Sequence, residues 1–233
     1  MQSIRVSSRA FAVSAAMMLA GCAGAGVASA PASAPASAPA SAPAPARGGD
    51  TTGLIPAGYG TLRQEDISVT LTFQGLTVRA LPLNESFIRT LAPDSYRNLH
   101  ALRESKRPVL DQIARRTGAP SLEVWYVTFF NLQQGEARFS PIDVVLSNQG
   151  RDYRPLDAVA LDTHFSDQRL RQSESATGLL VFDGAIDANQ SLTMMIGTQI
   201  GSDWQVVLRR VESERSAIRS RAGAKGGSAP GER

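Results

Sequence analysis

The sequence is poor in the residues that most often carry out chemistry. Its 233 residues include a single cysteine, Cys22, and only two histidines, His100 and His164. The region after the N-terminal segment therefore has no disulfide, no cysteine nucleophile and no cysteine-ligated zinc, and a three-histidine metal site is impossible within one chain. A domain without disulfides has to rely on its hydrophobic core.

Recognisable catalytic motifs are also missing. The sequence has no Gly-x-Ser-x-Gly turn, no phosphate-binding Walker loop, no dinucleotide-binding glycine pattern and no His-Glu-x-x-His. A serine hydrolase would need one of the two histidines as its base, and neither has a nearby serine in such a turn. We therefore expect a protein without enzymatic activity, cofactor or metal.

Charge of one sign does not dominate either. The chain has 24 Lys and Arg against 21 Asp and Glu. Arg5 and Arg9 precede a short apolar run at the N-terminus, and without them 22 basic residues face the 21 acidic ones. A chain this close to neutral gives little support to nucleic-acid binding.

The N-terminal segment has the layout of a secretory signal. Arg5 and Arg9 are followed by an apolar run over residues 10–20, which is shorter than the ~20 residues that span a bilayer. A basic start, a short apolar stretch and small residues at its end are typical of a cleaved export signal. The run ends in Leu19, Ala20, Gly21 and Cys22.

These four residues resemble the lipobox of bacterial lipoproteins. The resemblance implies that a peptidase removes residues 1–21 and that Cys22 becomes the acylated first residue, with enough lipid to hold the protein at the membrane. Ala23, where an aspartate would signal inner-membrane retention, implies the outer membrane with the domain facing the periplasm. Two alternatives stay open: an ordinary signal cut after Ala28 or Ala30, and a Cys22 without any special role.

Residues 22–58 are expected to form a disordered spacer. A Pro-Ala-Ser-Ala unit repeats across residues 30–45, and such a segment has too little apolar surface to offset the entropy of ordering. Regular prolines favour an extended polyproline II chain, in which sixteen residues reach roughly 50 Å. The spacer would hold the domain clear of the membrane, or it is low-complexity sequence without a length requirement.

Residues 59–211 are predicted to form an antiparallel β-sandwich. Alternating or continuous apolar segments between turn signals predict its strands. The predicted strands cover 67–73, 76–81, 122–131, 139–146, 177–182, 192–196 and 204–208. Residues 67–81 contain a turn at Gln74-Gly75 and should form a hairpin. The chain from Leu156 to Leu170 is expected to be irregular.

A helical insertion is predicted at about 84–117, and a short helix at 212–222 is expected to precede a disordered end at 223–233. Asn84 and Asp94 can cap helices, Pro93 should stop the first one, and Pro108 should break or kink the second. Three basic residues of the insertion, Arg103, Arg107 and Arg115, suggest a docking surface for an acidic protein or lipid headgroups. The alternative is an ordinary solvated helix face.

Four aspartates at intervals of five residues suggest metal binding as an alternative function. Asp152, Asp157, Asp162 and Asp167 lie around His164, and such a loop could bind calcium or another metal. Calcium loops, however, need alternating oxygen ligands and a glycine at a sharp turn, which this stretch lacks. The aspartates are equally compatible with turns in an exposed connection.

Short segments of the domain resemble the immunoglobulin-like lipoprotein domains of the telokin-like class. These segments are residues 127–131, ending in Asn131, then 139–141, 150–153 and 178–183. The resemblance covers roughly residues 121–210 and excludes the helical insertion. It implies a fold and an exported location without implying a reaction. We therefore expect a lipid-anchored envelope protein that binds or scaffolds an envelope protein partner, or a structural accessory of a secretion or assembly machine.

Overall fold

The structure is mainly β, with antiparallel sheets and a few helices. The computed structural model describes residues 53–201 and 203–226. The predicted lipobox with Cys22, the signal peptide, nearly all of the spacer and the last seven residues lie outside the described part. The helical elements are η1 (Gln64–Ile67), α1 (Glu85–Ile88), α2 (Pro93–Thr117), η2 (Pro141–Asp143), α3 (Thr163–Asp167) and α4 (Trp204–Gly226).

The larger sheet has five antiparallel strands in the order β1-β2-β3-β9-β7. Their bounds are β1 (Val69–Phe73), β2 (Leu76–Pro82), β3 (Leu122–Asn131), β9 (Ser175–Asp183) and β7 (Asp157–Ala160). The predicted hairpin is confirmed as β1–β2. Its turn residues Gln74 and Gly75 have φ angles of 47° and 78°, the positive values that two-residue hairpin turns require.

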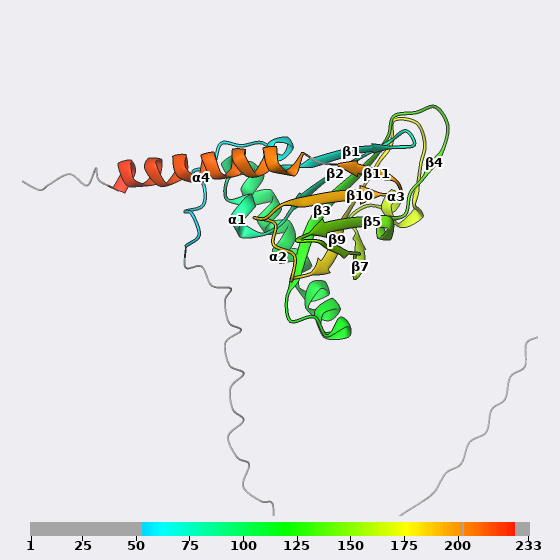
Figure 1. The fold of residues 1–233 in the computed structure, drawn as a ribbon, viewed down its shortest axis with the longest axis horizontal. Coiled ribbons are helices and arrows are strands. Elements are labelled where there is room, and N and C mark those ends of the chain that lie inside the picture. The colour runs from blue at the N-terminus through cyan, green and yellow to red at the C-terminus, as the bar shows by residue number, and fades with distance from the viewer. Residues whose placement is uncertain (1–52, 202, 227–233) are drawn as a thin grey trace, which may run out of the picture. The chain divides into compact units, whose positions relative to one another are not determined.

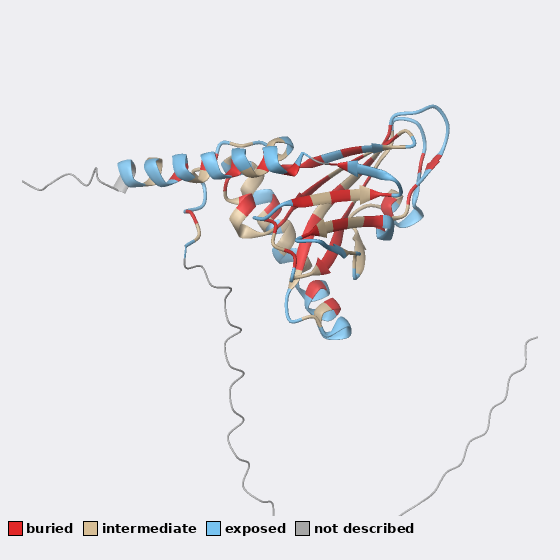
Figure 2. Cartoon of the chain, viewed as in Figure 1, coloured by how far each residue is buried: buried red, intermediate tan, exposed pale blue. Residues whose placement is uncertain are grey.

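A second sheet of four strands has the order β11-β10-β5-β6, and a two-stranded ribbon pairs β4 with β8. The bounds are β5 (Val144–Asn148), β6 (Arg151–Tyr153), β10 (Leu192–Ile196), β11 (Gln199–Gly201), β4 (Ala137–Arg138) and β8 (Arg169–Leu170). In Figure 1, β10 and β5 lie in front of the strands of the larger sheet. Figure 2 shows buried residues alternating with more exposed ones along both layers.

The core lies between the inward faces of the two sheets. Leu71, Val78, Phe129 and Ala176 form one cross-strand row of the larger sheet, and all four are buried. The smaller sheet contributes a second set of buried residues from alternate positions: Val144, Leu146, Leu192, Met194 and Ile196. Along the β1–β2 hairpin the two-residue period of the sequence agrees with this burial.

The insertion is one short and one long helix. Asn84 caps α1 as predicted, since its Oδ1 accepts from the Phe87 N–H. Pro93 does not end a helix: it is the first residue of α2, where a proline loses no hydrogen bond. The helix is not broken at Pro108, because α2 continues through it. The kink that was the other expectation at this residue stays a prediction. Pro108 is exposed.

Helix α2 covers part of the outward face of the larger sheet. It buries Leu99, Leu110 and Ile113, and outward-facing Val124 and Val181 are buried as well. Figure 1 shows α2 passing behind β3, on the side away from β10 and β5. The helix therefore shields this end of the sheet from water.

The predicted strand at 204–208 is wrong, because these residues begin α4. Trp204 is fully buried, and its indole lies 5.4 Å from the Phe87 ring and 5.3 Å from the Trp125 ring, between centroids. Its Nε1–H donates to the carbonyls of Ala188 and Gln190. The start of α4 therefore closes one end of the core.

Two further segments differ from the prediction. Residues 139–146 do not form one strand, since Pro141 opens the 3-10 helix η2 and the strand starts at Val144. The stretch expected to be irregular contains β7, α3 and β8. Short strands and single-turn helices are stabilised by the contacts they make rather than by a repeating pattern, so the sequence signal there is weak.

Two buried asparagines fix the loops at opposite ends of the sheets. Asn131 ends β3, and its Nδ2 donates to the carbonyls of Gly135 and Leu170 while its Oδ1 accepts from the Gln133 N–H. Asn148 ends β5 and makes the same three kinds of bond to Asp187 and Ser191. Each side chain thus satisfies loop backbone groups that no strand pairs.

The immunoglobulin-like arrangement is not confirmed. In that arrangement the second and third strands of the chain belong to different sheets. Here β1, β2 and β3 are consecutive neighbours in one sheet.

Candidate functional site

An apolar hollow opens between the two sheets at the end marked by the β1–β2 turn. It has a volume of about 320 Å³, which lies in the range of small-molecule sites. Six apolar side chains line it, namely Phe73, Leu76, Val78, Phe129, Phe139 and Ile196. We call this site the apolar hollow.

Four separate segments of the chain build the walls of the apolar hollow. The β1–β2 hairpin and β3 supply one side, and Ile196 at the end of β10 supplies the opposite sheet. Phe139 comes from the connection between β4 and η2 and stacks on Phe129 at 4.3 Å between centroids. Phe165 of α3 packs edge-on against Phe139 at 6.0 Å. This aromatic cluster fixes the inner wall.

The rim of the apolar hollow is polar. Gln74, Arg138, Ser140 and Asp143 lie at its edge, so one cation and one anion are available beside an apolar interior. A hollow lined mainly by apolar groups with a few polar groups at its edge is the usual form of a small-ligand site.

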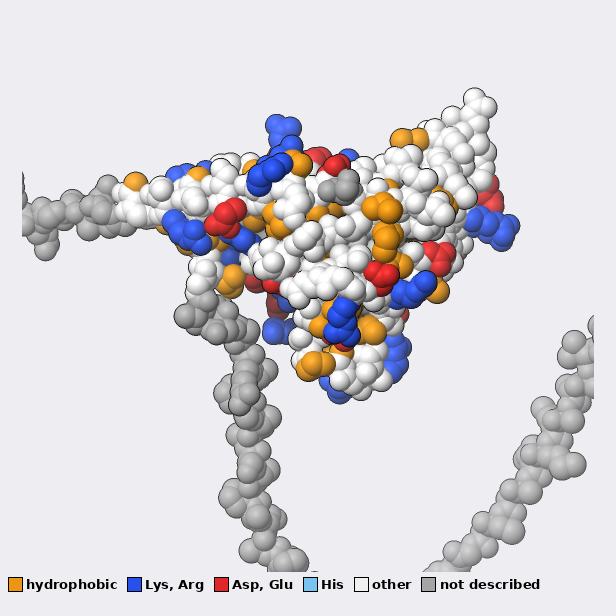
Figure 3. Space-filling view, viewed as in Figure 1, with side chains coloured by type: hydrophobic (Ala, Val, Ile, Leu, Met, Phe, Trp, Pro, Cys, Tyr) orange, Lys and Arg blue, Asp and Glu red, His pale blue; other side chains and the backbone are white. Residues whose placement is uncertain are grey.

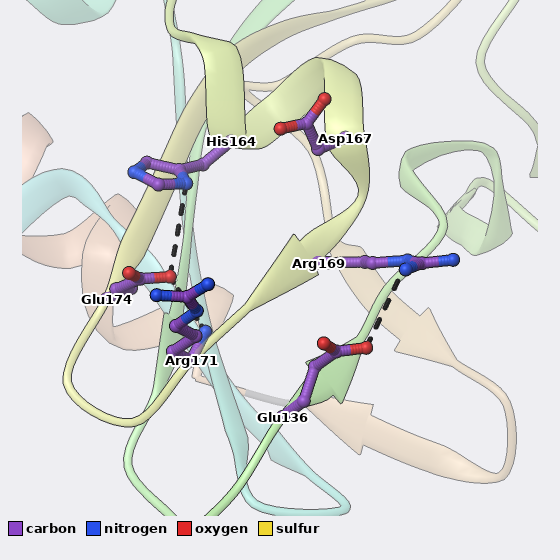
Figure 4. Close-up of a pocket in the computed structure, with 6 residues that line it drawn as sticks. All are labelled: Glu136, His164, Asp167, Arg169, Arg171 and Glu174. Atoms are coloured by element: carbon purple, nitrogen blue, oxygen red, sulfur yellow. Dashed lines mark hydrogen bonds and ion pairs between the residues drawn. The ribbon is translucent and has the colours of Figure 1, made fainter.

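A second, charged hollow of about 570 Å³ lies beside the β4–β8 ribbon. Its lining, shown in Figure 4, is Glu136, His164, Asp167, Arg169, Arg171 and Glu174. The ion pairs across it are long: His164 Nδ1 lies 3.9 Å from Glu174 Oε2, and Arg169 Nε lies 4.0 Å from Glu136 Oε1. Exposed pairs of this length contribute little to stability.

The aspartates of the alternative metal-binding interpretation have separate roles in the structure. Asp157 pairs with Arg116 of α2, and Asp162 caps α3 while also accepting from the Thr177 N–H. Of the four aspartates only Asp167 lines the charged hollow together with His164. Among the described residues no group of three or more histidine, cysteine or acidic side chains is placed to hold a metal ion.

The three arginines of the predicted partner surface lie in different surroundings. Arg103 is half-buried and its charge acts on the buried carboxylate of Glu123. Arg107 pairs with Glu104 at 3.0 Å, whereas Arg115 is exposed. Arg103 and Arg115 are twelve positions apart, which is roughly 18 Å along a helix. The docking role of these residues stays a prediction.

A polar cluster that the sequence did not suggest joins α1 to α2. Glu85 accepts from Arg89 Nε at 2.6 Å and lies 2.8 Å from His100 Nδ1, and the Tyr96 ring stacks on His100. Burial alone would raise the pKa of Glu85, but hydrogen bonds from Arg89 and His100 outweigh it and lower that pKa. Arg89 also donates to the Ile55 carbonyl, so the cluster holds the entering chain.

The described chain enters at the end opposite the two hollows. Ile55 is buried, four residues before the predicted start of the domain. Thr61 donates from its N–H and its hydroxyl to Glu214 Oε1 of α4, at 2.8 and 2.9 Å. Figure 1 shows this first segment beside α4 and α1, with β4 and the β1–β2 turn at the far side.

A small apolar row also lies on the outward face of the smaller sheet. Ile200, Met195 and Val145 are direct cross-strand neighbours there, and Ile200 is 62% exposed. Figure 3 shows hydrophobic side chains in a short column over β10 and β5. Scattered exposed apolar residues are normal on folded domains, so this short row does not by itself indicate a binding surface.

Comparison with known proteins gives no family model, no curated protein and no solved structure that matches this chain. In residues 53–201 and 203–226 no helix is both long and apolar enough to cross a membrane.

The apolar hollow was missed in the sequence because its walls come from segments far apart in the chain. Only the alternation along the predicted hairpin, which places Phe73 and Val78 on one face, was visible.

Proposed function

We propose that this chain is a lipid-anchored cell-envelope protein that binds a small apolar ligand in the apolar hollow. The anchor is the acylated Cys22 of the lipobox-like segment, and the location is the periplasmic face of the outer membrane. The short motifs shared with immunoglobulin-like lipoprotein domains agree with an exported two-sheet domain. The role is binding rather than catalysis.

One observation carries this proposal. The chain enters the domain beside α1 and α4, and the apolar hollow opens at the opposite end of the sheets. The chain that leads to Cys22 therefore joins the domain at its helical end. The apolar hollow, with its polar rim, lies at the other end of the sheets and is not covered by this entering segment.

Replacing the cysteine tests the anchor. The Cys22→Ala variant of the full chain should move from the membrane fraction to the soluble periplasmic fraction, because lipid chains supply the membrane affinity. The wild-type protein should carry a lipidated N-terminal residue by mass spectrometry. Ser33→Ala in the spacer serves as the matched control and should stay with the membrane. Cleavage elsewhere, or an unmodified cysteine, would contradict the anchor.

An uncharged fluorescent probe tests the hollow. N-phenyl-1-naphthylamine should bind the purified domain at one site with a rise in fluorescence. Ser140→Trp, which places an indole at the rim, should weaken this binding at least about tenfold, whereas Ser213→Trp on the exposed face of α4 should not. Equal binding to both variants, or no binding to the wild type, would show that the hollow is not a ligand site.

A further inference from the structure

The β4–β8 ribbon sets two arginines directly opposite each other. Arg138 of β4 pairs in register with Arg169 of β8, so both side chains leave the same face of the ribbon. Like charges at directly opposed positions destabilise a strand pair. The ribbon therefore carries an electrostatic cost that an anion between the two guanidinium groups would remove.

Among the described residues, both arginines pair with the same acidic residue, and both pairs are long. Glu136 Oε1 lies 3.7 Å from Arg138 Nε and 4.0 Å from Arg169 Nε. Both guanidinium groups keep most of their donors free, since their side chains are 72% and 57% exposed. Planar guanidinium groups bind carboxylate and phosphate through paired hydrogen bonds.

The arginine pair adjoins the apolar hollow. Arg138 itself stands at the rim, and the next residue, Phe139, forms part of the inner wall. The opposite residue, Arg169, faces the charged hollow. A single ligand can thus place an apolar chain against Phe129 and Phe139 and its head group on the ribbon.

We infer that the ligand is a single-chain amphiphile with an anionic head group, held by Arg138 and Arg169. This inference rests on the proposed binding function and adds the chemical class of the ligand. The anionic head group of the ligand lies between the two guanidinium groups. The Glu136 carboxylate approaches these groups only to 3.7 and 4.0 Å. Asp143, on the rim, opposes the same charge and so limits the affinity.

Two ligands of equal chain length separate the head group from the chain. Decanoate and decanol, each below its aggregation limit, are titrated against the domain loaded with N-phenyl-1-naphthylamine. The wild-type domain should release the probe at about tenfold lower decanoate than decanol, because a hydrogen bond to a charged group contributes about 1.5–3 kcal/mol and 1.4 kcal/mol is tenfold in affinity.

Three variants make the test specific. Arg138→Ala combined with Arg169→Ala should remove the roughly tenfold preference of the domain for decanoate over decanol. Asp143→Asn should increase that preference, and Arg115→Ala on α2 should leave it unchanged. Thermal unfolding of each variant checks the fold, and exposed positions of this kind shift stability by about 0.5 kcal/mol or less.

The outcomes distinguish this inference from the proposed function. If the probe binds but decanoate and decanol displace it equally in the wild type, the hollow is a ligand site and the anionic head group is refuted. If the double variant keeps the preference for decanoate, the arginine pair is not its source. If neither the probe nor either ligand binds, the proposed function itself fails.

Discussion

The Trp204→Ala variant is expected to lose about 4 kcal/mol of unfolding free energy. Complete truncation of a buried aromatic side chain costs about 3–5 kcal/mol through lost transfer energy and the cavity left behind. Trp204 is fully buried between Phe87 and Trp125, and both rings would lose a neighbour. For a domain of this size the midpoint of thermal unfolding should fall by roughly 10 °C.

A pair of conservative variants separates packing from hydrogen bonding at this site. Trp204→Phe removes an indole N–H that donates to two carbonyls. Trp125→Phe removes a buried indole N–H that has no hydrogen-bond partner among the described residues. The two changes delete the same atoms. Trp204→Phe should therefore destabilise more, by about 1–2 kcal/mol, because it leaves buried acceptors unpaired.

Urea unfolding of the three variants measures this order directly. The expected sequence of stability is wild type and Trp125→Phe above Trp204→Phe, and Trp204→Phe above Trp204→Ala. A Trp204→Ala protein as stable as the wild type would show that α4 does not close the core. Equal losses for the two phenylalanine variants would show that the hydrogen bonds of Trp204 contribute nothing.

The Glu123→Gln variant is expected to be more stable than the wild type at pH 8 and equal to it at pH 4. Glu123 lies on the inward face of β3 and is 9% exposed. Burial raises its pKa to about 7, while the hydrogen bond from Asn84 and the charge of Arg103 act in the opposite direction. The nearby charge of Asp187 adds to the rise.

The sign of the pH dependence follows from which state binds the proton. Below the ordinary pKa of 4.5 the carboxyl is protonated in both the folded and the unfolded chain, so it has no effect. Between pH 4.5 and 7 the unfolded chain releases the proton first, and stability falls as the pH rises. Above pH 7 both states are ionised and the loss is constant, at about 3 kcal/mol.

Glutamine removes this loss because it carries no charge, and its side-chain oxygen can still accept from Asn84 Nδ2. Chemical unfolding between pH 4 and pH 8 should show a falling curve for the wild type relative to Glu123→Gln. Glu104→Gln, an exposed member of an ion pair on α2, is the matched control and should follow the wild type. A constant difference across this range would show that Glu123 does not titrate with folding.

The strands that the sequence predicted best are those in which one face is buried along the whole length. Val69, Leu71, Val78 and Ala80 alternate with polar residues, and the two-residue period assigned each to the inward face. β3 and β9 were found because their apolar runs are long and flanked by turn residues. The Asn84 cap was also visible, because an N-cap acts within three residues of the chain.

The errors arose where the pattern is compatible with two structures. Residues 204–208 contain two valines and a leucine that suit a strand, and only the fit of Trp204 between Phe87 and Trp125 favours the helix. Pro108 was expected to interrupt a helix, and its exposed position in α2 allows the helix to continue. Such choices depend on what lies opposite the segment, which local sequence does not record.

By itself, the sequence determined the class of the domain and the prediction of its anchor. The small number of cysteines and histidines restricted the available chemistry. The alternation of apolar and polar residues predicted strands, and Cys22 at the end of the apolar run predicted lipidation. Only the tertiary structure decided that Phe73, Phe129, Phe139 and Ile196 enclose a hollow with Arg138 at its rim. The physical reason is that a hollow is formed by contacts between distant segments, whereas sequence patterns report only neighbours along the chain.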